Sequence, residues 1–389
     1  MRRFNLRVLV FLSLGHLTVD IYQGALPAIL PFLKENLNLT YTKAGSILIM
    51  ANFTSCLLQP LFGFLSDKRE QAFLLPLGTF AAGVGYALIS VPSHFLPVLM
   101  LVCASGLGVA SYHPEGYKLA GFFTGQRPAT GMSIFSVGGN LGFALGPTIA
   151  IWVISHLGFT SLSVVMLPAL LFTAAIIAGR GSVAVPPGAA LAGWGAGVAA
   201  KKGVYTSLAL TIGVVMMRSW IQMGVAAYIP FYFIEELKSD PVYAANLVTV
   251  FLLGGAAGTL VGAPVADKWG HRFVLRASML LTTLVFPLIF FAEGRLLFVL
   301  LFVLGALLIS SFSVTVVMGQ KLLPRNLGIA SGLMVGFSIG AGGIGVTLLG
   351  MVADWFGAYT ALKSIAVLPL AGFVLSMILT YPPDREGTA

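Results

Sequence analysis

The chain has 389 residues, of which 58% are hydrophobic and 9% are charged, and its formal net charge is +9. Soluble domains carry about a quarter charged residues, so this composition excludes an ordinary soluble protein and indicates a membrane protein. A membrane-spanning helix needs about 20 mostly apolar residues, and the length is sufficient for about twelve such spans.

Apolar runs that are interrupted by charged residues, Pro and Gly predict six helices in the first half of the chain. They cover residues 7–33, 43–65, 71–91, 95–120, 127–156 and 160–179. The charged start resembles a secretory signal, but its apolar run continues through His16 and Asp20 without a convincing cleavage site. We therefore assign it to the first span. Cys56 and Cys103 lie within apolar runs and are expected to be free thiols.

A second series of six predicted helices covers residues 204–236, 241–266, 272–292, 295–320, 326–355 and 357–381. The segment between the two series, residues 180–203, is rich in Gly, Ala and Pro and is expected to be a linker, with room for a short interfacial helix. The predicted fold class is an all-α polytopic membrane protein, with one six-helix bundle over residues 1–179 and another over residues 204–389.

Lys and Arg are unevenly distributed between the two sides of the predicted membrane. With a cytoplasmic N-terminus, 16 of them lie on the cytoplasmic side and 5 on the other. Positive residues concentrate on the cytoplasmic side of membrane proteins, so both termini and the linker are predicted to be cytoplasmic. A basic chain can also bind nucleic acid, but here the charge is spread over loops at one membrane face, so no such partner is expected.

Polar residues in the first predicted span lie on one face of the helix: Ser13, His16, Asp20 and Gln23. A charge at the bilayer centre costs at least about 3 kcal/mol, so this face must look into the bundle or a water-filled cavity. Removal from water should favour the protonated form of Asp20, as a proton carrier requires, and His16 could share the proton. The alternative is a static hydrogen bond that ties this helix to a neighbour.

Helix 95–120 carries a second polar group. Tyr112 and Glu115 share a face, whereas His113 is expected to point elsewhere on the same turn, and Pro114 should kink the helix. Glu115 could relay or release a proton; the alternative is again a structural hydrogen bond.

In helix 204–236, Thr211, Arg218 and Gln222 align on one face. Arg218 is the one cation predicted near mid-span in the second half, and it could bind an anionic substrate or pair with Asp20.

A loop motif is repeated in the two halves of the chain. It comprises Gly63, Asp67 and Lys68 in the first half and Gly262, Asp267, Lys268 and Arg272 in the second. An acid at a helix end can accept hydrogen bonds from the N-terminus of a neighbouring helix. We therefore expect both motifs to hold one conformation of the protein as a gate; the alternative is a pair of solvated turn charges. Repeated halves are how many transporters build a site at their interface.

The repeated loop motif resembles that of the major facilitator superfamily, and the resemblance covers the whole chain. The segments GHLTVDIYQGALPAILPFLKE, LLQPLFGFLSDKR, SYHPEGYKLA and FSVGGNLGFALGP further resemble the fosmidomycin-resistance branch. The first loop motif departs from the family pattern, since Glu70 and Gln71 stand where Gly and a basic residue are usual, so its gate is expected to be weaker.

The resemblance implies twelve helices in two bundles, with helices 1, 4, 7 and 10 around a central cavity, and transport by alternating access. It implies proton-coupled export of a small anionic or amphiphilic compound from bacteria by an inner-membrane protein acting as a monomer, with a proton gradient and no cofactor. The residues assigned to the proton path are Asp20, Glu115, His16 and His113. Those assigned to the substrate are Arg218, Gln23, Tyr112, Asn140 and Gln222. Proton-coupled uptake of an organic anion is the main alternative, and a membrane-embedded enzyme or sensor is a more distant one.

Glycines recur every four residues in two predicted helices and are expected to allow close helix packing. They are Gly138, Gly142 and Gly146 in the first half and Gly332, Gly336 and Gly340 in the second. The GFSIG segment around Ser338 has the G-x-S-x-G spacing of serine hydrolases but no strand-to-helix elbow, so no catalysis is expected there. No metal site is expected either, because His16 and Asp20 lack a third ligand.

The predicted topology can be tested by labelling. Single cysteines placed at positions Lys202 and Gly387, in a variant without Cys56 and Cys103, should react with a membrane-impermeant maleimide in inside-out vesicles but not in intact cells. Reaction of either position from outside intact cells would contradict the topology.

Overall fold

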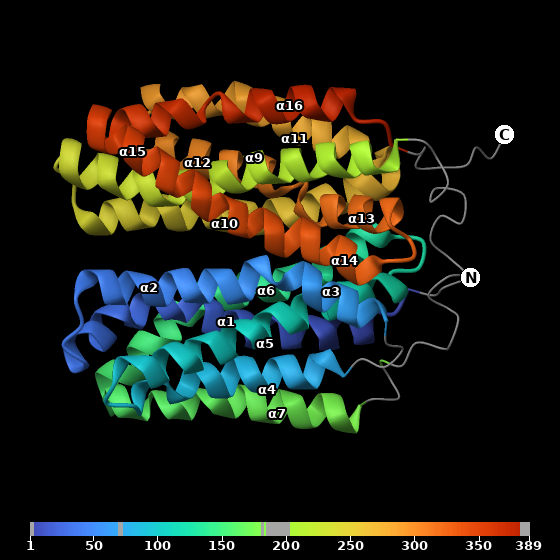
Figure 1. Ribbon diagram of the computed structural model, residues 1–389. Helices are drawn as coiled ribbons and strands as arrows, with labels where there is room; N and C mark the ends of the chain where they lie inside the picture. Colours follow the sequence, from blue (N-terminus) through green and yellow to red (C-terminus); the bar gives the residue numbers. More distant parts are fainter. Residues whose placement is uncertain (1–3, 69–72, 180–182, 184–202, 382–389) are drawn as a thin grey trace. The chain divides into compact units, whose positions relative to one another are not determined.

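The computed structural model describes residues 4–68, 73–179, 183 and 203–381 (Figure 1). These residues are predominantly helical, with one isolated bridge between Phe4 and Thr124 and no strand among them. The predicted all-α fold class is confirmed. Most of the expected linker, and Glu70 and Gln71 in the first loop motif, lie outside the described residues.

The first half of the chain forms the six predicted helices, several of them in pieces. They are α1 (Leu6–Asn36), α2 (Tyr41–Asn52), η1 (Phe53–Leu57), α3 (Gln59–Asp67), α4 (Leu74–Ala87), η2 (Leu88–Ser90), α5 (Phe95–Phe122), α6 (Pro128–Leu157), η3 (Phe159–Val165) and α7 (Met166–Ala178). Helices α2, η1 and α3 follow one another as a single span, in which η1 is a π-helical turn. Such turns are rare and often occur at functional sites.

The second half follows the same plan. Its helices are α9 (Val204–Phe231), η4 (Tyr232–Glu236), α10 (Pro241–Trp269), α11 (His271–Val285), η5 (Phe286–Phe291), α12 (Gly294–Ile309), α13 (Phe312–Leu322), α14 (Leu327–Gly332), η6 (Leu333–Phe337), α15 (Ser338–Ile365) and α16 (Leu368–Ile378). Gly357 interrupts α15 with φ 83° and ψ 161°, close to the junction predicted between the last two helices. A positive φ is accessible to glycine at little cost, which explains a turn at this residue.

Ten helical stretches among the described residues are long and apolar enough to cross a membrane. One of them, Leu327–Ile378, has 52 residues and is divided by Gly357, and Leu74–Ser90 is a shorter apolar helix. Together these segments supply the twelve predicted spans.

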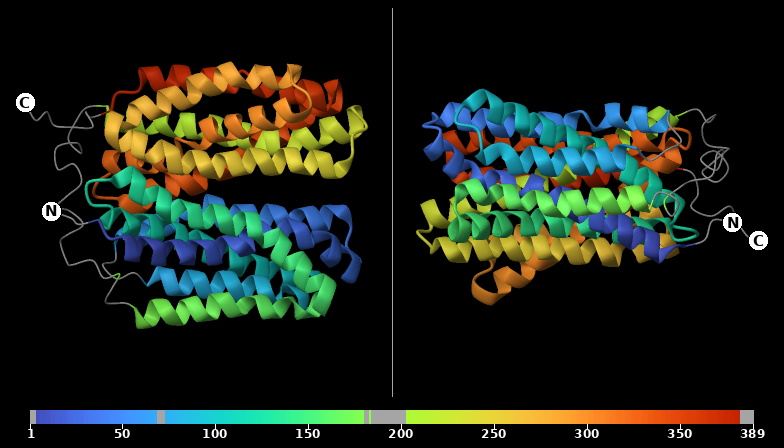
Figure 2. Two further views of the ribbon diagram at one scale, coloured as in Figure 1. Left: turned by 180° about the vertical axis from the view of Figure 1, so that it is seen from behind. Right: turned by 90° about the horizontal axis from the view of Figure 1, so that it is seen from below.

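The helices pack into two units that largely follow the two halves of the sequence. The first unit comprises residues 1–126, 134–194 and 325–337, and the second comprises residues 127–133, 195–324 and 338–389. The N-terminal turn of α6 therefore belongs to the second unit, and α14 with η6 belongs to the first. The boundary predicted at residues 180–203 would have placed each of these two segments in the other unit. Within each unit the helices run roughly parallel or antiparallel to one another (Figures 1 and 2).

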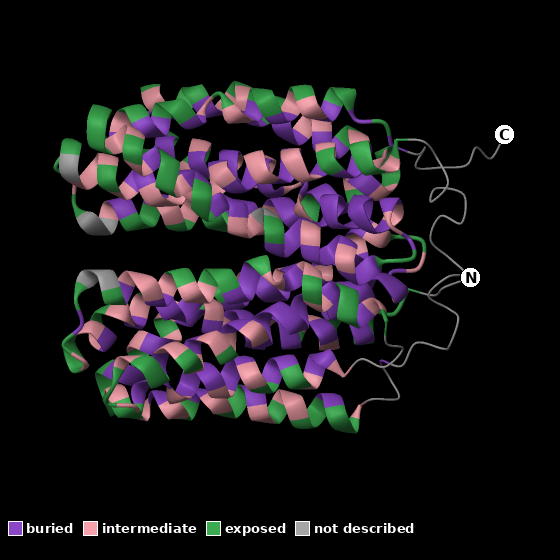
Figure 3. Cartoon of the chain, in the orientation of Figure 1, coloured by how far each residue is buried: buried purple, intermediate pink, exposed green. Residues whose placement is uncertain are grey.

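Glycines bring helix backbones into direct contact inside the first unit. A Cβ atom on Gly138 would lie 2.0 Å from the Ser13 carbonyl oxygen, and one on Gly142 would lie 2.2 Å from that of Leu17. The predicted stripe in α6 thus packs directly on α1. Exposed residues, many of them large and apolar, follow the outer faces of the helices in each unit (Figure 3), as expected for surfaces that meet lipid.

Candidate functional site

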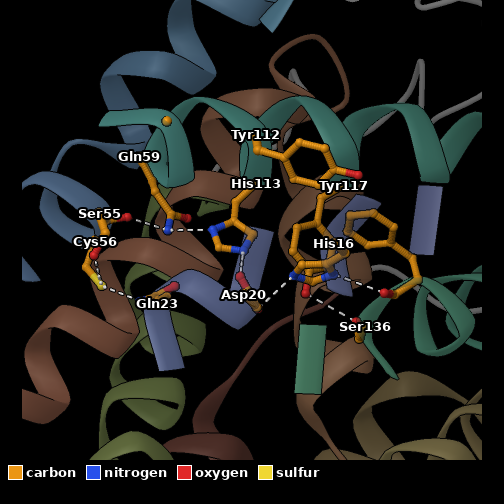
Figure 4. Close-up of polar contacts among 12 residues, drawn as sticks. His16, Asp20, Gln23, Ser55, Cys56, Gln59, Tyr112, His113, Tyr117 and Ser136 are labelled. Atoms are coloured by element: carbon orange, nitrogen blue, oxygen red, sulfur yellow. Dashed lines mark hydrogen bonds and ion pairs between the residues drawn. The ribbon is translucent and has the colours of Figure 1, made fainter. Parts of the chain in front are cut away.

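His16, Asp20 and His113 form a buried cluster in the first unit (Figure 4). His16 and Asp20 lie on successive turns of α1, and His113 comes from α5. His16 Nε2 lies 3.3 Å from Asp20 Oδ2, and His113 Nε2 lies 2.9 Å from Asp20 Oδ1. Both carboxyl oxygens therefore have an imidazole partner. Buried charges persist in proteins when they are paired and hydrogen-bonded, and this cluster meets that requirement.

The His16 ring is fixed by residues of α5 and α6. Its Nδ1 atom lies 3.0 Å from the Phe135 carbonyl oxygen, and the ring stacks on that of Phe135 at 4.4 Å between centroids. Tyr117 contacts it edge-on. A Cβ atom on Gly139 would lie 2.3 Å from His16 Nε2 and 2.6 Å from Asp20 Oδ2, so this glycine makes room for the pair. The four-residue glycine spacing predicted the roles of Gly138 and Gly142 but not that of Gly139, which is the second glycine of the GG pair in FSVGGNLG.

His113 is held by Gln59, a residue that sequence analysis missed. Gln59 Nε2 lies 3.2 Å from His113 Nδ1 and also donates a hydrogen bond to the Ser55 carbonyl oxygen at 2.8 Å. Gln59 is fully buried at the start of α3, directly after the π-helical turn η1. An amide in the middle of an apolar run was the available signal, because polar side chains inside a membrane usually face other polar groups.

The structure corrects two expectations about this cluster. His113 was expected to point away from the polar face of the first helix, but it contacts Asp20 on that face. Helix α5 is buried on several faces, so the face shared by Tyr112 and Glu115 is not the only one that meets other helices. The second expectation was that removal from water favours the protonated form of Asp20. Burial alone does not decide this, because two imidazoles at hydrogen-bond distance can stabilise the carboxylate.

A third potential metal ligand is also present, contrary to the expectation from sequence. Ligand atoms of His16, Asp20 and His113 lie within 4.8 Å of one another. A metal requires a lone pair from each group. The Gln59 amide nitrogen can only donate to His113 Nδ1, so His113 Nε2 carries the hydrogen that Asp20 Oδ1 accepts. The observed hydrogen bonds therefore suit a bound proton better than a metal ion.

Glu115 belongs to a different polar group at the end of α3. It is buried, and its electrostatic neighbours include Lys118 and Asp67. Lys118 Nζ donates hydrogen bonds to the Ser66 carbonyl oxygen at 2.5 Å and to Ser66 Oγ at 3.2 Å. Glu115 Oε2 is buried without a hydrogen-bond partner among the described residues. The structure thus places the two acids, Asp20 and Glu115, in separate groups of contacts within the first unit.

The residues assigned to the substrate are divided between the units. In the second unit, Arg218 is buried, with Nη1 donating to Thr315 Oγ1 at 3.1 Å and the guanidinium 4.9 Å from the Phe312 ring centroid. Gln222 is half-buried on the same helix.

In the first unit, Gln23 and Asn140 are half-buried, and Gln23 Nε2 lies 3.8 Å from Cys56 Sγ. Tyr112 is fully buried and donates its hydroxyl hydrogen to the Leu12 carbonyl oxygen at 2.8 Å, so it ties α5 to α1.

Both aspartates of the repeated loop motif accept hydrogen bonds from a helix N-terminus. Asp67 accepts from the Gly328 and Ile329 amides at 2.8 and 2.9 Å. Asp267 accepts from the Ala129 and Thr130 amides at 2.9 and 2.8 Å, and from Thr130 Oγ1 at 2.6 Å. The predicted contact with a helix N-terminus is present at both aspartates, whereas the gating role stays a prediction.

The glycines of the two motifs are not equivalent. A Cβ atom on Gly63 would lie 2.3 Å from the Gly328 carbonyl oxygen, whereas one on Gly262 would meet the Ser310 carbonyl oxygen at 2.3 Å. Gly262 stands one position further from its aspartate, and buried Ala263 takes the place that corresponds to Gly63.

The basic residues of the motifs pack on aromatic rings: Lys68 Nζ lies 4.2 Å from the Phe64 ring centroid, and Lys268 Nζ lies 5.8 Å from that of Trp269. Arg272 lines a hollow beside Trp269 and Phe273.

Comparison with known proteins decides the family. The sequence profile of the Major Facilitator Superfamily matches residues 12–245 and 208–389. The chain belongs to the major facilitator superfamily. It is 34% identical over 386 residues to an uncharacterized MFS-type transporter, YfnC, of Bacillus subtilis, covering 97% of this chain and 93% of that protein. It is 30% identical over 402 residues to the fosmidomycin resistance protein of Escherichia coli, covering 99% and 94%.

Solved structures show the same fold for this superfamily member. FucP in the outward conformation superimposes with a TM-score of 0.75 at 15% identity, covering 96% of this chain and 99% of that one. The human organic anion transporter MFSD10 gives a TM-score of 0.72 at 17% identity, covering 95% and 99%. Membership of the superfamily, shown by the profile and the relatives, makes the chain a multi-pass membrane transporter.

The Asp267 contacts suggest a test of the gate. Asp267→Asn replaces a charged acceptor by an amide whose NH₂ group would face a backbone N–H, so a conformation that depends on these bonds should lose about 1–3 kcal/mol, or roughly 5- to 150-fold in population. Accessibility of single cysteines from each membrane side measures the shift. The matched control is Asp354→Asn, at an exposed residue of α15. Equal accessibility in both variants would show that Asp267 does not gate.

Proposed function

We propose that this protein is a proton-coupled exporter of a small anionic or amphiphilic compound, working by alternating access. The observation that carries the proposal is the buried cluster of His16, Asp20 and His113. Ionisable side chains rarely cluster inside a membrane-spanning bundle without a functional reason, since burying them is costly.

The relatives support the direction and class of transport. The similar Escherichia coli protein is named for resistance to fosmidomycin, which favours export. A structure of similar fold belongs to a fucose:proton symporter and another to an organic anion transporter, so proton coupling and anion transport both occur on this fold. The same residues would serve proton-coupled uptake of an organic anion, which is the second candidate.

In the proposed cycle, the cluster binds a proton from one side of the membrane and releases it to the other. In the second unit, Arg218 recognises the negative charge of the substrate and Gln222 offers a neutral polar group. In the first unit, Gln23 and Asn140 offer neutral polar groups. Tyr112 ties α5 to α1 through its hydrogen bond to the Leu12 carbonyl oxygen. Glu115 releases the proton near the end of α3, and the hydrogen bonds of Asp67 and Asp267 hold one state of the cycle.

We also propose a bacterial cytoplasmic membrane location with both termini in the cytoplasm, a monomeric state, and a proton gradient as the energy source in place of a cofactor. The uneven distribution of Lys and Arg supports this orientation.

The proton role of Asp20 can be tested by Asp20→Asn, which resembles the protonated side chain but cannot release a proton. We expect substrate binding and exchange to persist and pH-driven accumulation in vesicles to be lost. Asp20→Ala should also fail, whereas His16→Gln should retain partial activity with a shifted pH optimum. Asp354→Asn is the control. If Asp20→Asn still concentrates substrate like the parent, Asp20 does not carry the proton and Glu115 becomes the candidate.

The role of Arg218 can be tested by measuring the binding of organic anions and phosphonates. A planar guanidinium can grip a carboxylate or phosphonate with two hydrogen bonds, so Arg218→Lys should weaken binding and Arg218→Ala should weaken it by roughly 10- to 100-fold. Thr315→Val, which removes the neutral partner of Arg218 and leaves the charge, is the control. Unchanged affinity for every anion in Arg218→Ala would assign Arg218 a structural role.

A further inference from the structure

The orientation of the Gln59 amide is fixed by its neighbours. The Ser55 carbonyl oxygen can only accept a hydrogen bond, so the atom that faces it at 2.8 Å must be the amide nitrogen. The second hydrogen of this nitrogen then points to His113 Nδ1 at 3.2 Å, which must accept it. A ring with an accepting Nδ1 is neutral and carries its hydrogen on Nε2. His113 is therefore a neutral donor to Asp20 Oδ1.

His16 has the opposite arrangement. Its Nδ1 faces the Phe135 carbonyl oxygen, so Nδ1 carries a hydrogen. In a neutral ring Nε2 would then be bare and would face Asp20 Oδ2 at 3.3 Å with a lone pair. Two lone pairs at this distance repel each other, so one proton must lie between the two atoms. It belongs either to an imidazolium at His16 or to a carboxylic acid at Asp20, and both assignments hold the same number of protons.

The other titratable side chains around the cluster have hydrogen-bond partners of their own. Tyr112 donates its hydroxyl hydrogen to Leu12, and the Tyr117 hydroxyl lies 3.2 Å from Ser136 Oγ. The Cys56 thiol contacts Ser55 and Gln23. The exchangeable proton is thus shared by His16 and Asp20.

Gln59 is also packed against a helix from the second half of the sequence. A Cβ atom on Gly332 of α14 would lie 2.7 Å from the Gln59 carbonyl oxygen. One on Gly336 of η6 would lie 2.4 Å from Gln59 Cβ and 2.5 Å from Cδ. Glycine at these two positions lets α14 approach the Gln59 backbone and lets η6 approach the Gln59 side chain directly. The same helix donates the Gly328 and Ile329 amide hydrogens to Asp67.

We propose that Gln59 is a positioning residue that confines the exchangeable proton to His16 and Asp20 and makes this confinement depend on the packing of α14 and η6 against α3. The role of that proton in transport rests on the proposed function. With Gln59 in place, an N–H group faces His113 Nδ1 and excludes a second proton there. When α14 and η6 move, the amide loses its support, and His113 Nδ1 becomes free to take up a proton.

Magnetic resonance of ¹⁵N-histidine-labelled protein in lipid nanodiscs tests this assignment without any substrate, because protonated and unprotonated ring nitrogens give distinct signals. The spectra of His16→Gln and His113→Gln assign the two rings. In the parent we expect an unprotonated Nδ1 at His113 and a proton at His16 Nε2 or between it and Asp20 Oδ2. Gln59→Met keeps the length of the side chain and removes the donor, so the unprotonated Nδ1 signal of His113 should be lost at mildly acidic pH where the parent retains it.

The link to α14 and η6 is tested by Gly336→Ala, whose new methyl group would displace Gln59. It should reproduce the loss of the His113 Nδ1 signal. The matched control is Gly343→Ala, since a Cβ atom at Gly343 meets nothing within 4 Å. Thermal unfolding of each purified variant confirms that the protein is folded, and Gly336→Ala keeps the test available if Gln59→Met does not fold.

An unprotonated His113 Nδ1 in Gln59→Met over the same pH range as in the parent would overturn the assignment. A Gly336→Ala spectrum equal to that of Gly343→Ala would overturn the link to α14 and η6. These spectra test the Gln59 proposal independently of the proposed function. The proposed proton role of Asp20 fails if Asp20→Asn still accumulates substrate in a proton gradient, and that result does not depend on the spectra.

Discussion

The structure of the first unit depends on the burial of one carboxyl group. Asp20 lies within the apolar part of α1, and both of its oxygens must find hydrogen-bond donors from the protein. His16 and His113 meet this need, but each imidazole in turn needs a partner for its other nitrogen. Those partners are a carbonyl of α6 and an amide of α3. One buried acid therefore fixes the relative positions of α1, α3, α5 and α6, and Gly139 is required because the cluster leaves no room for a side chain there.

The two halves of the chain each contain an aspartate that accepts hydrogen bonds from a helix N-terminus, but the contacts differ in detail. Both place a carboxylate at a helix N-terminus, where unpaired amides and the helix dipole favour a negative charge. Asp267 gains a third hydrogen bond from Thr130, whereas Asp67 has two and relies on the close approach of Gly63 to Gly328. The weaker first gate expected from Glu70 and Gln71 stays a prediction, since these two residues lie outside the described part of the chain.

Much of the fold could be predicted from the sequence because lipid imposes strong constraints. Apolar runs had to be helices, and the boundaries fell within a few residues of those observed, including the break near Gly357. The contact of both aspartates with helix N-termini followed from local chemistry. His113, Gln59 and Gly139 could not be placed in the same way. Their roles depend on how α3, α5 and α6 pack around α1, and a helix that is buried on several faces gives no single face from which to infer its neighbours.

The hydrogen bonds also indicate how a proton could change the conformation of the protein. With the proton present, His16 and Asp20 attract each other; without it, the Nε2 lone pair faces a carboxylate at 3.3 Å. The His16 ring cannot reverse without losing its bond to Phe135, and its stacking on that ring resists rotation. A movement of α1 relative to α6 would relieve this repulsion, and these helices are in backbone contact through Gly138 and Gly142. A packed interface responds to such a change by a discrete shift, which is the kind of response that the proposed transport cycle requires.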